Sequence, residues 1–271
     1  MSRARRWLLG LKAIVSRELL RFIHQRERFF AALVRPLLWL LVFAAGVHTH
    51  LGPTISPPYE TPVPYQVYIV PGLIGMIQLF NGMQSSLSMV YDREMGSMRL
   101  LLVTPLPRWW LLLCKLIASV VVSIAQVYAF LLIASAFGIA MPAWGYATLL
   151  PALIVTGLTL GAIGLFLSAA VRQLENFAGI MNFVIFPMFF LSSALYPLSQ
   201  MRDASPLLWS VCSVNPFTWM VELIRFALYG RAEPEPVLWT LLTLAVALAL
   251  AIRGYNPARG MIRRRGGGGG D

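Results

Sequence analysis

The chain has 271 residues, of which 58% are hydrophobic and only 12% are charged. An ordinary soluble domain has about 45–50% apolar and about 25% charged residues, so this composition argues against a soluble enzyme. The formal net charge is +11, yet residues 116–171 form 56 consecutive positions without Asp, Glu, Lys or Arg. Since one bilayer crossing takes about 20 apolar residues, this stretch is long enough for two crossings. The sequence therefore predicts an all-α membrane protein.

Residues 1–28 predict an amphipathic helix ahead of the first span. On a helical wheel its apolar residues fill one half and its basic residues crowd into a narrow arc opposite. Such a helix lies flat on the cytoplasmic leaflet as an interfacial helix. Lys12, Arg17 and Glu18 interrupt the apolar run that a signal peptide needs, so we expect the segment to be retained. A simple lipid anchor and a docking element for a cytoplasmic partner both remain open as its role.

Six apolar runs of spanning length follow, each bounded by charges or by Pro and Gly. They predict a six-helix transmembrane domain over residues 29–253. The loop after the second span covers 92–110, an outer hairpin covers 199–235, and a basic, Gly-rich tail over 254–271 is expected to be disordered. The six predicted spans are about 29–48, 66–91, 112–137, 146–170, 177–198 and 236–253.

Positive charges are distributed unevenly between the two sides that six spans define. Nineteen of the 22 Lys and Arg residues fall on the side of the two termini, if Arg35 is counted as reaching back to that surface. Only Arg202, Arg225 and Arg231 fall on the other side. By the positive-inside rule both termini are cytoplasmic. The basic excess therefore indicates orientation and contact with anionic membrane lipid, and it does not indicate nucleic-acid binding.

The segment 199–235 is apolar in patches but divided into short pieces. The pairs Ser205-Pro206 and Asn215-Pro216 each place a capping residue before a proline, which predicts the starts of two short helices. The second helix runs for 14 residues to Tyr229, a length of about 21 Å, which is too short to cross a bilayer. We therefore expect a re-entrant or interfacial helical hairpin on the outer side.

Two charges lie in the middle of that second short helix. Glu222 and Arg225 are three positions apart and so share one face of the helix. We expect these charges to face each other or water, because hydrocarbon solvates neither. Whether the hairpin takes part in transport or only covers the outer surface remains open.

The loop 92–110 is the most informative stretch of the sequence. It opens with charges of both signs, and Gly96 then permits a sharp change of backbone direction. An apolar run at 100–103 follows, and Pro105 and Pro107 end any helix before the tryptophans at 109 and 110. A short apolar-faced helix displayed to the cytoplasm suits insertion into a groove on another protein. An ordinary loop resting on lipid is the alternative.

These residues resemble a known family. Residues 91–98 (Tyr-Asp-Arg-Glu-Met-Gly-Ser-Met) with 100–105 (Leu-Leu-Leu-Val-Thr-Pro) look like the coupling-helix region of type-2 ABC exporter permeases. Residues 215–219 (Asn-Pro-Phe-Thr-Trp) look like the outer segment before their last span. The similarity covers nearly the whole chain in order, and it is closest to permeases of bacterial polysaccharide, lipooligosaccharide and drug export. Arg99 departs from the family pattern, because relatives often carry an acidic or neutral residue there.

The resemblance implies that the energy comes from another subunit. The chain has no G-x-x-x-x-G-K-[ST] sequence, so we expect it to bind no cofactor, with ATP held by a separate ABC ATPase. The family arrangement implies a second copy of the permease and a location in the bacterial inner membrane. The coupling helix would sit in a cleft of each ATPase. The candidate ATPase-coupling residues are Arg93, Glu94, Gly96, Met98 and Arg99, with Arg17, Arg21 and Arg28 as supporting contacts.

Polar and small residues mark two of the predicted spans. In the second span Gln78, Asn81, Ser85 and Ser88 share one face, and amides in hydrocarbon need a partner or a wet cavity. They are the candidate lining of a translocation path, with hydrogen bonding between helices as the alternative. In the fourth span, small residues recur over 157–168 at a spacing that lets another helix approach closely.

Two rival functions come from other classes. A membrane enzyme would need a catalytic or metal-binding constellation, and we expect neither catalytic residues nor a metal site. A membrane-anchor subunit without transport would show no ATP-dependent behaviour and would not depend on Glu94 or Gly96. The sequence does not reveal the cargo, because its outer aromatic residues serve equally well as interface anchors and as surfaces for sugar rings.

Overall fold

The computed structural model describes residues 3–24, 26–46, 58–94, 107–171 and 174–254 of the chain. All regular secondary structure in these ranges is α-helical, which confirms the predicted fold class at the level of an all-helical membrane protein. The coupling loop at 95–106 and the tail from 255 lie outside the described residues. The helices are α1 (Arg3–His24), α2 (Arg26–Gly46), α3 (Tyr65–Glu94), α5 (Arg108–Ala136), α6 (Gly145–Ala170), α7 (Leu174–Phe190), α8 (Leu198–Ala204), α9 (Pro206–Val214), α10 (Pro216–Leu228) and α11 (Pro234–Gly254).

Three of these helices, α5, α6 and α11, are long and apolar enough to cross a membrane. Helices α2 and α7 contain shorter apolar stretches, Ala32–Val42 and Gly179–Phe190. Helices α9 and α10 pass the same test only as a pair, and they are bent by 78° at Asn215. The number of spans by length and composition is therefore three or four in the described residues, and the expected six stays a prediction.

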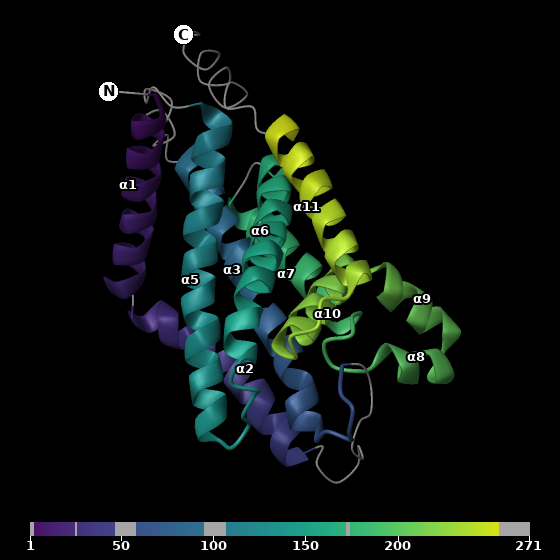
Figure 1. The fold of residues 1–271 in the computed structure, drawn as a ribbon. Coiled ribbons are helices and arrows are strands. Elements are labelled where there is room, and N and C mark those ends of the chain that lie inside the picture. The colour runs from purple at the N-terminus through teal and green to yellow at the C-terminus, as the bar shows by residue number, and fades with distance from the viewer. Residues whose placement is uncertain (1–2, 25, 47–57, 95–106, 172–173, 255–271) are drawn as a thin grey trace, which may run out of the picture.

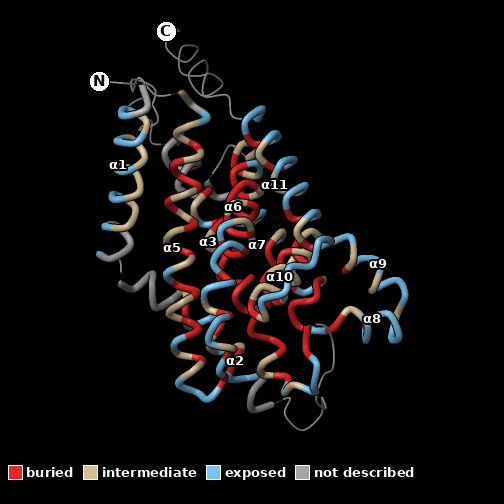
Figure 2. Tube along the Cα trace, viewed as in Figure 1, coloured by how far each residue is buried: buried red, intermediate tan, exposed pale blue. Residues whose placement is uncertain are grey.

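Helix α3 is the centre of the bundle, because α2, α5, α6, α7 and α10 all pack against it (Figure 1). Every residue from Tyr68 to Leu79 is buried. Figure 2 shows buried residues gathered along the inner helices, whereas α1 and α11 are mostly exposed or intermediate. Since the neighbours of α3 are protein, the amides of Gln78 and Asn81 find hydrogen-bond partners that lipid lacks.

Glycines bring α3 and α6 into backbone contact. A Cβ atom added at Gly82 would lie 2.8 Å from the carbonyl carbon of Leu160. A Cβ atom added at Gly164 would lie 2.5 Å from the Ser86 hydroxyl and 2.8 Å from the Gly82 carbonyl oxygen. Side chains do not tolerate such distances, so the expected close approach at the small residues of α6 is confirmed at Gly164. Its partner on α3 is Gly82.

Helix α7 ends earlier than the sequence predicted. The expected fifth span runs to residue 198, but the helix stops at Phe190 and the chain turns through 191–196. Within this turn the Ser192 hydroxyl donates to the Phe189 carbonyl oxygen (2.6 Å) and accepts from the Ala194 amide (3.2 Å). These local bonds replace the backbone bonds that a continuing helix would form.

The short helices of the outer segment begin where the sequence predicted. The Ser205 hydroxyl accepts a hydrogen bond from the Leu208 amide, and the Asn215 side chain accepts one from the Phe217 amide. Both N-caps are therefore confirmed, each with proline in the first turn. After α10 the chain turns at Gly230, whose φ of 64° favours glycine.

The N-terminal helix differs from the expected geometry. A helix lying flat on a leaflet would run across the ends of the spans, but Figure 1 shows α1 alongside α5, and the two helices are in contact. The helix ends at His24, so Arg28 belongs to the first turns of α2. The apolar face of α1 therefore has a protein neighbour, which competes with lipid for the same surface.

We expect Gly82→Ala to destabilise the protein, because the new methyl group would force α3 away from the backbone of α6. Overpacking of this kind costs about 1–3 kcal/mol. The measurement is the unfolding temperature of the purified protein in a mild detergent, followed by tryptophan fluorescence. Gly179→Ala is the matched control, since a Cβ atom there meets nothing within 4 Å. An unfolding temperature for Gly82→Ala at or above that of the control would contradict the prediction.

Candidate functional site

The candidate coupling residues lie at one end of the bundle where the structure describes them. Arg93 and Glu94 form the last turn of α3. The loop residues Gly96, Met98 and Arg99 lie outside the described residues. The coupling role of these residues therefore stays a prediction.

The supporting arginines are distributed over two helices. Arg17 lies on α1 with 60% of its side chain exposed, and its guanidinium donates to the neighbouring Glu18 carboxylate (3.0 Å). Arg21 is also on α1, whereas Arg28 is on α2. The exposed guanidinium of Arg17 is available to a partner, because a surface ion pair of this kind contributes little and breaks readily.

Three tryptophans join the start of α1 to the start of α5. The Trp7 ring stacks on Trp110 with centroids 5.2 Å apart and meets Trp109 edge-on at 5.4 Å. The Trp110 indole N–H donates to the Trp7 carbonyl oxygen (3.2 Å). Aromatic pairs of these geometries add to the burial of the rings. Since α5 begins directly after the predicted coupling loop, the cluster connects that loop to α1.

The polar face of α3 is engaged by neighbouring helices. Gln78 is 1% exposed; its amide N–H donates to the Leu153 carbonyl oxygen of α6 (2.9 Å), and its oxygen accepts from Thr156. About one turn further along α3, the Asn81 amide donates a hydrogen bond to the Gln126 side chain of α5. The structure therefore brings these two candidates into contacts between helices, which is the alternative to lining a path.

The other two path candidates differ in what the structure describes. Ser85 lies on α3; its side chain is half-buried and interacts with another residue. The side chain of Ser88 lies outside the described residues. A role for the four residues in lining a translocation path stays a prediction.

Arg35 is a residue whose placement the sequence did not predict. Its guanidinium carbon lies 3.8 Å from the centre of the Phe80 ring, at the middle of α3. The count of charges by side took this arginine to reach back to the cytoplasmic surface; in the structure its guanidinium lies beside the middle of α3. The available signal was its position seven residues into the predicted first span, too deep for the flanking charge of a helix end.

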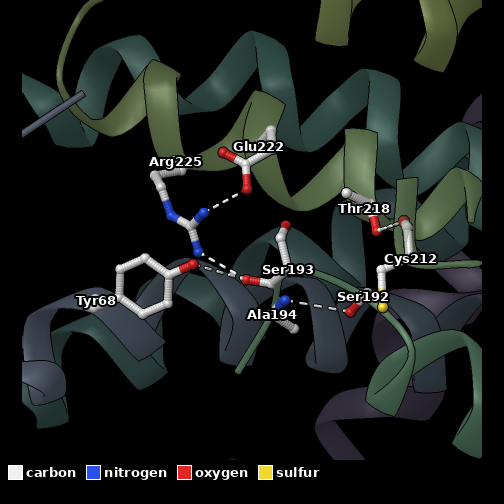
Figure 3. Close-up of polar contacts among 8 residues, drawn as sticks. All are labelled: Tyr68, Ser192, Ser193, Ala194, Cys212, Thr218, Glu222 and Arg225. Atoms are coloured by element: carbon white, nitrogen blue, oxygen red, sulfur yellow. Dashed lines mark hydrogen bonds and ion pairs between the residues drawn. The ribbon is translucent and has the colours of Figure 1, made fainter. Parts of the chain in front are cut away.

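A buried arginine, Arg225, organises the opposite end of the bundle (Figure 3). Arg225 is 2% exposed; one guanidinium nitrogen pairs with the Glu222 carboxylate and another donates to the Ser193 carbonyl oxygen (3.0 Å). The guanidinium also lies over the Tyr68 ring, 4.1 Å from its centre, and the Tyr68 hydroxyl donates to the same Ser193 oxygen (3.1 Å). The expected pairing of Glu222 with Arg225 is confirmed.

This cluster ties three parts of the chain together. Arg225 belongs to α10, Tyr68 to α3, and Ser193 to the turn after α7. The Asn215 amide adds a second connection, because it donates to the Met188 carbonyl oxygen of α7 (2.9 Å). A buried charge with a partner carboxylate and further hydrogen bonds is tolerated in a protein interior. The outer segment is therefore fixed to the bundle through specific polar contacts.

A small aromatic pocket lies beside this cluster. Its volume is about 280 Å³, below the usual range for drug-sized ligands. The Tyr59 ring meets Tyr229 edge-on with centroids 5.0 Å apart, and Glu60 pairs with Arg231 at the rim. Burial raises the pKa of the Tyr59 phenol, and the opposing effect of the nearby Arg225 charge is smaller, so the phenol stays neutral. In the described residues no three His, Cys, Asp or Glu side chains form a potential metal site.

Comparison with known proteins identifies the class. The profile of the ABC-2 type transporter family matches residues 10–229. A putative transport permease, ycf38, from Porphyra purpurea is 29% identical over 226 residues, which are 82% of this chain and 75% of the relative. The ycf38 protein of Cyanophora paradoxa is 30% identical over 222 residues, 78% of this chain and 72% of the relative.

A bacterial relative gives a similar result. The probable multidrug ABC transporter permease YbhR of Escherichia coli K12 is 28% identical over 218 residues, which are 76% of this chain and 55% of YbhR. The chain therefore belongs to the ABC-2 type transporter family. It is a multi-pass membrane protein, the membrane permease component of an ABC transporter, and its family associates with an ABC ATPase.

We expect Glu222→Leu to lower the free energy of unfolding by about 3–5 kcal/mol, because it leaves the Arg225 charge buried without its carboxylate. Adding Arg225→Met should recover a large part of this loss, since the double variant has no unpaired charge. Denaturant unfolding in detergent measures both variants.

The matched control for this prediction is the exposed pair of Glu60 and Arg231, whose side chains are 80% and 45% exposed. Glu60→Leu should change stability by about 1 kcal/mol or less. If Glu222→Leu and Glu60→Leu had equal effects, the buried pair would not fix the outer segment.

Proposed function

We propose that the chain is the membrane-spanning permease subunit of an ATP-driven exporter and that the loop after α3 couples it to a separate ABC ATPase. The family match over residues 10–229 carries this proposal, because it spans α3, the loop and the outer segment. The ATPase subunit would bind all of the ATP, and this chain would bind no cofactor. The proposed contacts with the ATPase are Arg93, Glu94, Gly96, Met98 and Arg99, flanked by Arg17, Arg21 and Arg28.

We further propose six spans, formed by α2, α3, α5, α6, α7 and α11, in the bacterial inner membrane with both termini cytoplasmic. The start of α1, the start of α5 and the end of α11 lie at the same end of the bundle, which supports an even number of crossings (Figure 1). Residues 1–28 would begin at the cytoplasmic side and continue along α5 as α1, and 254–271 would be the tail. The excess of positive charge near the termini supports this orientation.

The outer segment is proposed to be re-entrant, and its two ends supply the support. Near its beginning, the Leu195 carbonyl oxygen accepts a hydrogen bond from Tyr65 (2.7 Å). At its end, Tyr229 contacts Tyr59. Both ends therefore lie beside residues 59–65, just before and at the start of α3. The longest helix between them, α10, has 13 residues and reaches about 20 Å, which is less than a bilayer core.

The working transporter is proposed to contain two copies of this chain, with the translocation path between them. Asn81 and Ser85 are only half-buried within one copy, so they remain candidates to line the path together with Ser88. Gln78 would instead hold α3 to α6. In each cycle, closure of the ATPase pair on ATP would push the coupling loop and shift the helices between inward- and outward-accessible states.

Gly96→Pro tests the coupling. We expect the complex of permease and ATPase to assemble but its transport-coupled ATP hydrolysis to fall to the rate of the ATPase alone, because proline fixes the backbone where the loop must turn. ATP hydrolysis in proteoliposomes measures this. Gly52→Pro, in the loop between the first two predicted spans, is the control and should leave coupled hydrolysis unchanged.

A non-transporting membrane anchor is the rival function, and the same variant separates the two. An anchor needs no coupled turnover, so full coupled hydrolysis in Gly96→Pro would contradict the proposed joint. Purification of the native chain without any ATPase would contradict the exporter as a whole.

The tryptophan cluster predicts a second coupling effect. Trp110→Leu removes the ring that stacks on Trp7 and the N–H that bonds to its carbonyl group, so α1 should separate from α5. We expect coupled ATP hydrolysis to fall several-fold while the ATPase still co-purifies. Trp239→Leu is the control. The Trp239 ring, near the start of α11, stacks on Trp219 of α10 and takes no part in the contact between α1 and α5. Equal rates for Trp110→Leu and the wild type would show that the cluster does not transmit the movement.

A further inference from the structure

Arg35 holds a positive charge halfway along the bundle. The Phe80 ring beneath its guanidinium belongs to the sixteenth of the 30 residues of α3. Two residues earlier, Gln78 bonds to Thr156, the twelfth of the 26 residues of α6. Helix α6 is one of the helices long and apolar enough to span a membrane. The guanidinium of Arg35 therefore lies level with the middle of a span.

This charge has no carboxylate partner among the described side chains. The buried Arg225 pairs with Glu222, and the exposed Arg231 pairs with Glu60. Arg35 lies over the ring of Phe80, and its own side chain is exposed in the single chain. An unpaired charge in hydrocarbon is costly, so residues of this kind face a water-filled cavity or the interior of an assembly. Such a position suits a surface that faces water or another subunit.

A second polar side chain extends the same surface. Gln84 lies one turn after Phe80 on α3, so the two residues share a face of the helix. Gln84 is exposed, and its amide forms no hydrogen bond with another described residue. Next to Phe80, the half-buried Asn81 is held by Gln126. An exposed charge and an exposed amide at mid-span both favour contact with water or with another polar group.

No hydrogen bond from the Arg35 guanidinium to another residue is found in the part of the chain that the structure describes. The ring of Phe80 covers one face of the planar group, and a cation–π contact of this kind fixes its position without using its N–H groups. The guanidinium edge has the geometry to bind two oxygens of a phosphate or a carboxylate at once. Leu38, one turn along α2, is 55% exposed and offers an apolar surface beside the charge.

We propose that Arg35, held over Phe80 one helical turn from Gln84, binds the anionic group of an amphipathic cargo in the middle of the translocation path. The inference rests on the proposed function and names its class of substrate: a molecule with a phosphate or carboxylate group and an apolar part. A head group of the surrounding bilayer is the other source of such an anion. The cytoplasmic end of α3 is 14 residues from Phe80, or about 21 Å along the helix. An arginine side chain is shorter than this distance, so Arg35 over Phe80 does not reach a head group at the level of that end.

Binding of small amphiphiles to the purified full-length chain tests the proposal. The chain is kept in dodecyl maltoside, which has no phosphate, and titrated with hexyl phosphate, inorganic phosphate and the neutral hexyl glucoside. We expect saturable binding of hexyl phosphate and much weaker binding of the other two probes, because only hexyl phosphate has both the charge and the apolar part. Microscale thermophoresis gives the dissociation constants.

The variants assign the binding to the site. Arg35→Gln should weaken hexyl phosphate binding about tenfold or more, and Arg35→Lys should retain part of the affinity, because lysine keeps the charge but not the planar fork. Phe80→Leu should weaken binding by a smaller factor. Arg202→Gln is the matched control, since Arg202 also lies over a ring, that of Trp209 at 5.3 Å, but in the outer segment. Its binding should equal that of the wild type.

Three results would overturn the proposal. Equal binding of hexyl phosphate by wild type and Arg35→Gln would show that Arg35 is not part of the binding site. Equal binding of hexyl glucoside and hexyl phosphate would show that the site does not recognise the negative charge. Loss of hexyl phosphate binding when phosphatidylglycerol is added to the micelles would assign the arginine to a membrane lipid.

These measurements need no ATPase, so they are independent of the exporter proposal. A chain that drives coupled ATP hydrolysis but binds hexyl phosphate without Arg35 contradicts this inference alone. A chain that binds hexyl phosphate through Arg35 but recruits no ATPase contradicts the proposed exporter and leaves the anion site in place.

Discussion

The backbone contact between α3 and α6 is the constraint on which the rest of the structure depends. At Gly82 and Gly164 the two helices approach so closely that neither position has room for a side chain. One turn before Gly82 on α3, Gln78 lies within hydrogen-bond distance of α6. Polar residues can then occupy the centre of a membrane protein, because protein groups replace the water that hydrocarbon lacks.

The chain holds two arginines against aromatic rings in opposite ways. Arg225 is enclosed, with a carboxylate, a carbonyl oxygen and an aromatic ring around it, and it fixes the outer segment to α3 and to the turn after α7. Arg35 also lies over an aromatic ring, but no carboxylate of the described residues pairs with it. In the first arrangement the charge is neutralised by groups of the fold itself. In the second the charge is available to the anionic ligand that we propose.

Much of the fold could be predicted from the sequence because the signals are local. The charge-free stretch over 116–171 coincides with two of the helices that are long and apolar enough to span a membrane, and the Ser-Pro and Asn-Pro pairs mark the starts of α9 and α10. Pairing of Glu222 with Arg225 followed from their spacing. Each of these features depends on residues close together in the chain, where helix geometry alone relates them.

The features that could not be predicted depend on contacts between distant residues. The end of α7 at Phe190 is set by the Ser192 hydroxyl and by Asn215, 27 residues beyond the Met188 carbonyl group that it contacts. The position of Arg35 is set by Phe80 of the next helix, and no spacing rule relates these two residues. Likewise, hydrophobic periodicity gave α1 an apolar face but could not say that α5 would contact it.

The joint at Gly82 and Gly164 also has a mechanical meaning. Two helices whose backbones touch cannot slide or tilt against each other without a clash, so we expect α3 and α6 to move as one rigid body. A change between two conformations would then occur by movement of the other helices relative to this pair. In an assembly of two copies, each α3–α6 pair would keep its internal geometry while the distance between the copies changes.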